Sequence, residues 1–108
     1  AEPSSIIRER VNQARKIQQN RFAGTDVACN AHMDVKMTAD WCALDSAGED
    51  LMHLAFDRMN LTARSYDRIL RVARTIADLS GEERISADHL AEAIQYRTYD
   101  FHLSEAEA

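Results

Sequence analysis

Residues 61–79 read LTARSYDRILRVARTIADL, and this stretch decides the fold class. Its apolar side chains recur at the 3.6-residue period of an α-helix and fall within one arc of the helical wheel. Three arginines lie on the opposite arc. The pattern predicts an amphipathic helix with one face on a core and an arginine stripe on the other. The apolar arc holds Tyr66, Ile69, Leu70, Val72, Ala73, Ile76 and Ala77, and the stripe holds Arg64, Arg68 and Arg71.

Both ends of this helix carry sequence signals. Thr62 is a good N-cap, because its hydroxyl can accept a hydrogen bond from a backbone N–H of the first turn. Leu61 precedes the cap and can pack against Tyr66 as a hydrophobic staple. Gly81 follows the last apolar residue and can adopt the left-handed conformation that ends many helices. These signals define where the helix begins and ends.

The segments before this helix are also predicted to be helical. A first helix runs from Ser4 or Ser5, with serine as its cap, to Phe22. Residues 23–44 have weak periodicity and room for one short helix between Asp34 and Cys42. The residues of the first helix expected to face the core are Ile7, Val11, Ala14, Ile17 and Phe22.

Two more helices complete the prediction. A capping box of Ser46 and Glu49 opens a helix that Asn60 ends. Ser86 caps a last helix that runs to about Arg97. The apolar faces hold Leu51, Leu54, Ala55 and Met59 in the former helix and Leu90, Ala93 and Ile94 in the latter, with Ile85 and Leu90 as a staple around Ser86.

The whole pattern predicts an all-α fold, a small helical bundle of about four to five helices, because no stretch alternates as a strand does. A chain of 108 residues has room for one domain. Within this single helical domain of residues 1–108, we expect a linker helix at 1–22, a helical core at 45–97 and a frayed acidic tail at 98–108. Trp41 and the four methionines are expected to fill the core.

The composition excludes several functions for these residues alone. The three glycines form no Gly-x-Gly pair and none precedes a lysine, so the chain has neither a dinucleotide fingerprint nor a P-loop. No apolar run approaches the roughly 20 residues of a membrane span. Two cysteines and no visible export signal suit the cytoplasm. A start at Ala1 rather than methionine leads us to expect a piece of a longer protein.

Charge is unevenly distributed along the chain, whose formal net charge is −5. Residues 1–22 carry +3 and residues 62–80 carry +2, so the remainder carries −10. An acidic domain repels the phosphate backbone at long range, and its non-specific binding to nucleic acid should be weak. The two basic segments can still meet an anion locally.

Metal and catalytic motifs are weak in this chain. Cys29 and His32 form one closely spaced pair of candidate zinc ligands, but ten residues separate the second pair, Cys42 and His53. A zinc module usually has two close pairs, so we expect no metal. The four histidines give no recognisable catalytic triad. Packing cysteines are the simpler interpretation. The four candidates are Cys29, His32, Cys42 and His53.

Residues 61–79, Ile85 and the run HLAEAIQYR at 89–97 closely resemble the C-terminal domain of magnesium-chelatase-like AAA+ ATPases. The similarity is greatest to the competence-associated ComM/YifB branch. The run IRERVNQAR at 7–15, with Gln18, Arg21, Asn30 and Ala31, resembles the segment that follows the ATPase core in that family. The resemblance covers most of the chain and is least specific at residues 32–58.

The resemblance implies the helical lid of a ring-forming, hexameric ATPase whose P-loop, Walker B acid and arginine finger lie in a core domain outside this chain. ATP and magnesium then belong to the full-length enzyme, and the isolated domain is not an enzyme. Arg64 matches the second sensor, which reaches the γ-phosphate. The implied partners are the AAA+ core of the same chain, neighbouring subunits and DNA, with no membrane. Remodelling of DNA is favoured over metal insertion into a porphyrin, and whether Arg64 acts on its own subunit's ATP stays open.

The arginines have simpler interpretations as well. A stripe on an amphipathic helix is most often a solvated face, and only the resemblance singles out Arg64. Arg68 and Arg71 are the secondary candidates for a functional role. They could help Arg64 to bind the phosphate or line a subunit interface. The simpler alternative is that they face solvent or pair with acids such as Asp67 and Asp78. In the first helix, Arg10 and Arg21 fall within the apolar arc. Two interpretations stay open: their aliphatic stems are partly buried at a contact between helices or domains, or their charged heads only extend from the apolar surface to solvent.

A different class of protein is the alternative. A long helix, a loop and a short capped helix also resemble the last part of a histone fold, which would make the chain a DNA-binding or assembly module. Arg84 in that loop would then contact phosphate. The −10 balance outside the basic segments and the additional first 44 residues disfavour this alternative.

Overall fold

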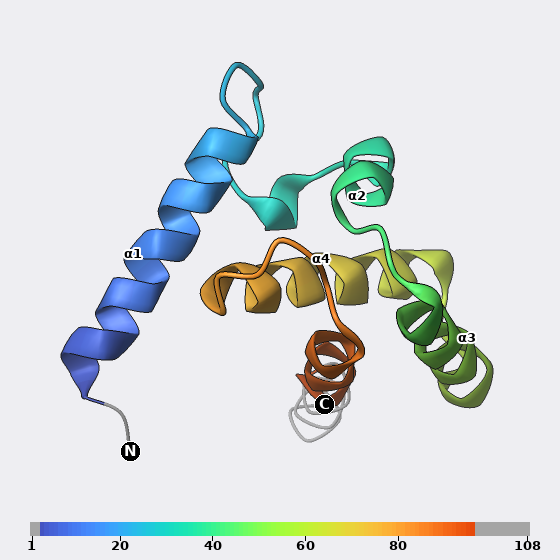
Figure 1. Cartoon of the computed structure of the whole chain (residues 1–108). Coiled ribbons are helices and arrows are strands. Elements are labelled where there is room, and N and C mark those ends of the chain that lie inside the picture. Colours follow the sequence, from blue (N-terminus) through green and yellow to red (C-terminus); the bar gives the residue numbers. More distant parts are fainter. Residues whose placement is uncertain (1–2, 97–108) are drawn as a thin grey trace, which may run out of the picture.

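The computed structural model describes residues 3–96 and contains helices and loops but no β-strand within that range (Figure 1). The all-α prediction is therefore confirmed, and the predicted tail at 98–108 lies outside the described residues. One isolated parallel bridge joins Leu44 to Ile85. The elements are α1 (Ser4–Arg21), a 3₁₀ turn η1 (Asn30–His32), α2 (Val35–Trp41), α3 (Ser46–Met59), α4 (Ala63–Leu79) and a further helical segment at 87–96.

Helix α4 is the centre of the fold. It runs across the middle of the molecule, with α1 beside its C-terminal half and α3 near its N-terminal end (Figure 1). Helices α1 and α2 and the turn η1 all pack against it. The apolar arc predicted for α4 is confirmed, because all seven residues lie in the core or pack against it. The buried core also contains Phe22, Met33, Cys42, Met52, Leu61, Ile85, Leu90 and Ala93.

The two ends of α4 form as the sequence predicts. The Thr62 hydroxyl accepts a hydrogen bond from the Ser65 backbone N–H at 3.1 Å. At the other end Gly81 has φ +70°, in the left-handed region that costs glycine little. The backbone N–H of Glu82 donates back to the Ala77 carbonyl at 2.9 Å, which is the long hydrogen bond of a Schellman motif. Local sequence alone thus determines the extent of this helix.

Two other helices begin on different caps from those predicted. Asp45 is the N-cap of α3, and its carboxylate accepts from the Gly48 N–H at 2.8 Å in place of the predicted Ser46 hydroxyl. Aspartate and serine are comparable caps, so two adjacent candidates could not be separated by propensity. The prediction of a serine cap on α1 is also wrong, because Pro3 holds that position without a side-chain hydrogen bond. Proline is favoured at helix starts since it lacks the N–H that would stay unpaired there.

The short helix expected between Asp34 and Cys42 is confirmed as α2, with Asp34 as its N-cap. In the last helical segment, the Ser86 hydroxyl accepts from the His89 N–H at 3.3 Å, and His89 Nδ1 accepts from the Ser86 N–H at 3.0 Å. Histidine therefore takes the place that glutamate or glutamine holds in a capping box. This pairing explains why His89 is buried.

The predicted core faces need three corrections. In α3 the predicted Ala55 is buried, but the side chain fully excluded from solvent is Met52, which the predicted face did not include, whereas Leu54 is 49% exposed. In α1 only the C-terminal half packs on the body, and Ile7 is 48% exposed. Trp41 is 43% exposed and is not a core filler, although the four methionines all lie in or against the core. Periodicity identifies an apolar face but not how far along the helix a neighbour covers it.

Candidate functional site

Arg64 is exposed in the first turn of α4, two residues after the N-cap Thr62. Among the described residues, no hydrogen bond or ion pair holds its guanidinium. Backbone N–H groups at the start of a helix lack intrahelical acceptors, and the helix dipole gives this end a partial positive charge. An always-charged guanidinium beside such an end is suited to bind an anion such as phosphate. The structure thus leaves the predicted residue available, on an exposed surface.

Arg68 and Arg71 follow along the same helix, and both line a groove of about 450 Å³ that does not include Arg64. Arg68 is exposed and Arg71 is half-buried. The walls also contain Val72 and Ile76 of α4 and the exposed ring of Tyr96. Of the lining residues within the described range 3–96, none is a carboxylate.

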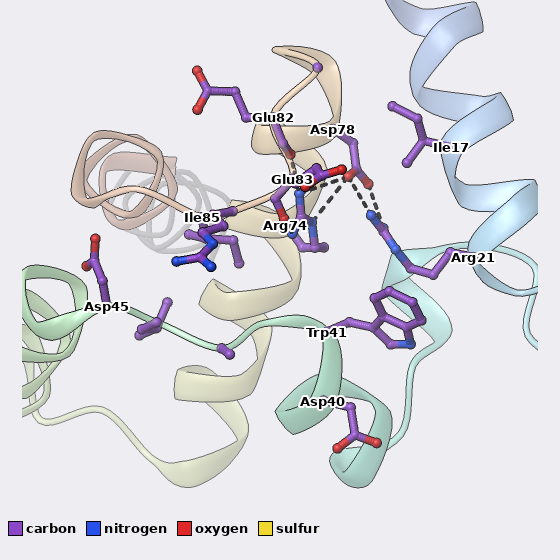
Figure 2. A pocket seen from close by; sticks show the side chains of 14 residues that line it. Ile17, Arg21, Asp40, Trp41, Asp45, Arg74, Asp78, Glu82, Glu83 and Ile85 are labelled. Carbon is purple, nitrogen blue, oxygen red and sulfur yellow. Dashed lines mark hydrogen bonds and ion pairs between the residues drawn. The ribbon is translucent and has the colours of Figure 1, made fainter.

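A buried ionic cluster lies near the other end of α4, and the sequence did not predict it. Asp78 accepts two hydrogen bonds from the guanidinium of Arg21, both at 2.8 Å, and one from the Asn30 amide at 2.8 Å. Arg74 Nε donates to the same carboxylate at 3.2 Å. We call Arg21, Asn30, Arg74 and Asp78 the buried cluster. It joins α1, η1 and α4, as Figure 2 shows for its two arginines and Asp78.

The buried cluster pairs its charges away from solvent and holds the loop that follows α4. Arg74 also donates to the backbone carbonyls of Glu82 and Glu83, at 2.7 and 2.8 Å, so it holds the loop that follows the helix. The Asp78 side chain is fully excluded from solvent, and the side chains of Arg21 and Arg74 are 7% and 3% exposed. A buried charge is tolerated only when it is paired and hydrogen-bonded. Among the described residues, Asp78 is the carboxylate that both guanidinium groups share.

Aromatic rings complete the environment of Arg21. Its guanidinium carbon lies 5.2 Å from the centre of the Trp41 ring and 5.9 Å from that of Phe22, within the range of cation–π contacts. Figure 2 shows Trp41 beside Arg21. The sequence left two interpretations of Arg21 open, and the buried contact is confirmed. Arg10, by contrast, is exposed.

Three members of the buried cluster, Arg21, Arg74 and Asp78, line an open pocket of about 870 Å³ (Figure 2). Apolar walls come from Ile17, Leu44 and Ile85, and Asp40 and Glu82 lie at its edge. The guanidinium N–H groups of Arg74 are occupied by the carbonyls and carboxylate described above. This pocket therefore presents mainly an aromatic and apolar surface, and the buried cluster serves the packing of α1 on α4.

The candidate zinc ligands do not come together. Cys29 Sγ lies 3.6 Å from His32 Nδ1, but Cys42 is buried in the core and His53 is exposed on α3. Both cysteines are free thiols. Within residues 3–96 no three histidine, cysteine or acidic side chains are grouped as metal ligands.

Burial raises the pKa of the Cys42 thiol from 9.0 to about 11, although the nearby charges of Arg74, Arg21 and Arg71 act in the opposite direction. Between these two values the thiol ionises in the unfolded chain but stays protonated in the folded one. We therefore expect the free energy of unfolding to fall as the pH rises from about 9 to about 11, by at most about 3 kcal/mol. Urea unfolding at pH 8 and pH 10.5 measures this loss.

The matched control is Cys42→Ala, which lacks the thiol. Burial also raises the pKa of Tyr66, so the ionisation of this tyrosine also lowers the free energy of unfolding at high pH. That contribution is the same in wild type and in Cys42→Ala. The difference between wild type and Cys42→Ala isolates the thiol. An identical pH dependence in the two proteins would show that Cys42 does not titrate as its burial predicts.

Comparison with known proteins places this sequence in a family. Residues 1–97 match the family described as magnesium chelatase, subunit ChlI C-terminal, and the chain belongs to it. The competence protein ComM of Haemophilus influenzae is 42% identical over 96 residues, which are 89% of this chain and 18% of ComM. The uncharacterised protein YifB of Escherichia coli is 37% identical over 104 residues, and YifB of Salmonella typhimurium is 31% identical over 99. Each of these two alignments covers 92% of this chain and 19% of the relative.

The chain thus spans about a fifth of the length of these relatives. It corresponds to their magnesium chelatase C-terminal domain, as the resemblance predicted. No helix among residues 3–96 combines the length and the apolar character that a membrane crossing needs.

Proposed function

We propose that this domain is the helical lid of a magnesium-chelatase-related AAA+ ATPase and supplies its second sensor, Arg64. The observation that carries the proposal is the exposed guanidinium of Arg64, without a partner among the described residues, at the N-terminus of the central helix of a magnesium chelatase C-terminal domain. Such a group can donate two hydrogen bonds to the γ-phosphate of ATP.

ATP is the substrate in this proposal, and only part of its site lies in this chain. Arg64 fits a phosphate oxygen, since it has a free planar fork and the positive end of a helix dipole beside it. The glycine loop and the acidic residues that hold ATP and Mg²⁺ would come from an AAA+ core elsewhere in the full-length protein. We place that protein in the cytoplasm as a hexameric ring. The lid would contact its own core and the neighbouring subunit.

The work done by the ATPase is proposed to be the remodelling of DNA. Support comes from the similarity to ComM, which is a competence protein by name. The histone-like alternative receives no such support. In addition, the apolar arc of α4 is covered by other parts of the same chain, whereas a histone fold needs a partner to cover it.

The test is Arg64→Ala in the full-length protein. We expect ATP hydrolysis to fall by one or more orders of magnitude, equivalent to about 1.5–3 kcal/mol, because a charge-assisted contact to the γ-phosphate is lost. The isolated domain carrying the same substitution should unfold within about 0.5 kcal/mol of wild type, since Arg64 is exposed. Steady-state turnover and urea unfolding are the two measurements.

The control is Arg58→Ala, which removes an exposed arginine at the end of α3. It should leave turnover unchanged. If Arg64→Ala hydrolyses ATP at the wild-type rate while Arg68→Ala or Arg71→Ala does not, the sensor is assigned to the wrong residue. If all three substitutions leave hydrolysis unchanged, the stripe is only a solvated face.

A further inference from the structure

We propose that copies of this chain associate head to tail, with the first two turns of α1 of one copy seated in the Trp41 pocket of the next. The Trp41 pocket is the open pocket of about 870 Å³ described above. The contact lies apart from the site proposed for ATP, because Arg64 is not among the described residues that line the pocket. Its biological role rests on the proposed ring, in which it would join neighbouring subunits.

The donated surface is the N-terminal part of α1, which the rest of the chain leaves uncovered. Ile6 and Ile7 are 45% and 48% exposed there. Single exposed apolar residues are common, but two adjacent isoleucines on an uncovered helix offer a surface that another molecule can bury. Arg8 and Arg15 lie within about 100° of Ile7 on the helical wheel, and both are exposed. The surface therefore combines an apolar centre with positive charge beside it.

The accepting surface is the Trp41 pocket, whose edge has the opposite charge. Trp41 is 43% exposed, although a ring of this size is usually well buried. Ile17, Leu44 and Ile85 form apolar walls. Tryptophan is a frequent anchor of protein interfaces, and an apolar centre within a polar rim is their usual arrangement. Outside the buried cluster, the described lining holds one guanidinium, that of Arg84, and four carboxylates, which belong to Asp40, Asp45, Glu82 and Glu83 (Figure 2).

The two surfaces complement each other in polarity and in charge. Ile6 and Ile7 can replace water on the Trp41 ring and the apolar walls, and such burial is favourable. Arg8 can then approach the carboxylates at the pocket edge, of which that of Asp40 is exposed. Opposite charges at the rim of an interface steer association and fix its register more than they add affinity. The apolar centre therefore supplies most of the affinity, and the rim supplies the specificity.

A copy of the chain cannot fill its own pocket. Helix α1 is continuous from Ser4 to Arg21, and Ile17 of the same helix is a wall of the pocket. Ile7 lies ten residues earlier, about 15 Å along the axis, and neither glycine nor proline occurs within 4–21 to bend the helix back. The contact must therefore join two copies. Because the donated and accepting surfaces differ, each copy can make two such contacts, and contacts of this heterologous kind build rings or filaments.

The experiment follows the sedimentation of the 108-residue chain over a range of concentrations, in the absence of ATP. Wild type should form species larger than a dimer as its concentration rises. Trp41 is the only tryptophan of the chain, so its emission should shift to shorter wavelength over the same range as the pocket is covered. A chain that stays monomeric up to about 1 mM, or that stops at a dimer, would overturn the proposal.

Two variants test the two surfaces separately. Ile7→Gln should weaken association by about 4- to 13-fold, the cost of leaving half of an isoleucine in water, and its control is Leu54→Gln, at a position that is 49% exposed on α3. Asp40→Lys reverses a charge at the pocket edge and should weaken association by about fivefold. Its control is Asp57→Lys, at an exposed position of α3. Both controls should associate as wild type does, and an equal loss in a variant and its control would overturn the proposal. All four positions are exposed, and circular dichroism should show that each variant is folded.

A mixture of the two variants tests the direction of the contact. Ile7→Gln keeps an intact pocket, and Asp40→Lys keeps an intact α1. At a concentration at which each variant alone is monomeric, an equimolar mixture should form a dimer with one copy of each, because one intact contact remains between them. A mixture that stays monomeric would overturn the head-to-tail contact. None of these results changes the test of Arg64, which measures ATP hydrolysis.

Discussion

Replacement of Asp78 by alanine is expected to lower the free energy of unfolding by about 3–5 kcal/mol, the largest effect of any single substitution considered. The carboxylate accepts from Arg21, Asn30 and Arg74, and all of these groups are shielded from solvent. Its removal leaves two guanidinium groups buried without a counter-charge. The cost is therefore the desolvation of unpaired charge in addition to the loss of hydrogen bonds. Urea unfolding followed by circular dichroism measures it.

The matched control for Asp78→Ala is Glu82→Ala. Glu82 lies four residues further along, its side chain is exposed, and Arg74 contacts only its backbone carbonyl, which the substitution retains. This variant should unfold within about 0.5 kcal/mol of wild type. A stability of Asp78→Ala within about 1 kcal/mol of wild type would mean that water enters the cluster and solvates the arginines.

Ile69→Ala is the second large effect, with an expected loss of about 2–5 kcal/mol. Ile69 is 1% exposed on the apolar arc of α4, so the substitution removes buried methyl groups and leaves a cavity in the centre of the fold. The same measurement applies. Its effect on ATP hydrolysis in the full-length protein should follow only from the unfolded fraction.

Leu54→Ala is the control for Ile69→Ala. Both substitutions shorten an aliphatic side chain to alanine, but Leu54 is 49% exposed on α3. We expect a loss below about 1 kcal/mol, since little apolar surface leaves the protein interior. Similar losses for Ile69→Ala and Leu54→Ala would contradict the central position of α4 in the core.

The parts of the fold that depend on neighbouring residues could be predicted from the sequence. The cap Thr62, the stop at Gly81 and the apolar arc of α4 all rest on contacts within a few residues, and all agree with the structure. Adjacent caps were harder to separate, because Asp45 and Ser46 have similar preferences. Arg64 was placed by resemblance, and its exposure fits the prediction without testing its role.

The buried cluster could not be predicted in the same way, because its partners are distant in the sequence. Arg21 and Asp78 are 57 residues apart. On the wheel of α4, Arg74 and Asp78 fall outside the apolar arc, and they are buried only because the side of the helix that they occupy is covered by α1 and η1. Two signals were present: Arg74 and Asp78 are four residues apart, and Arg21 lies within the apolar arc of α1.

Helix α4 also connects two ends of the molecule as a stiff rod. Arg64 and Asp78 are 14 residues apart, which is about 21 Å along a helix. Neither glycine nor proline interrupts residues 63–79, so the helix has no sequence cause for a kink. We therefore expect any tilt of α1 that is transmitted through the contact between Arg21 and Asp78 to move α4, and Arg64 with it, as a rigid body. The orientation of α1 would then set the position of the Arg64 guanidinium.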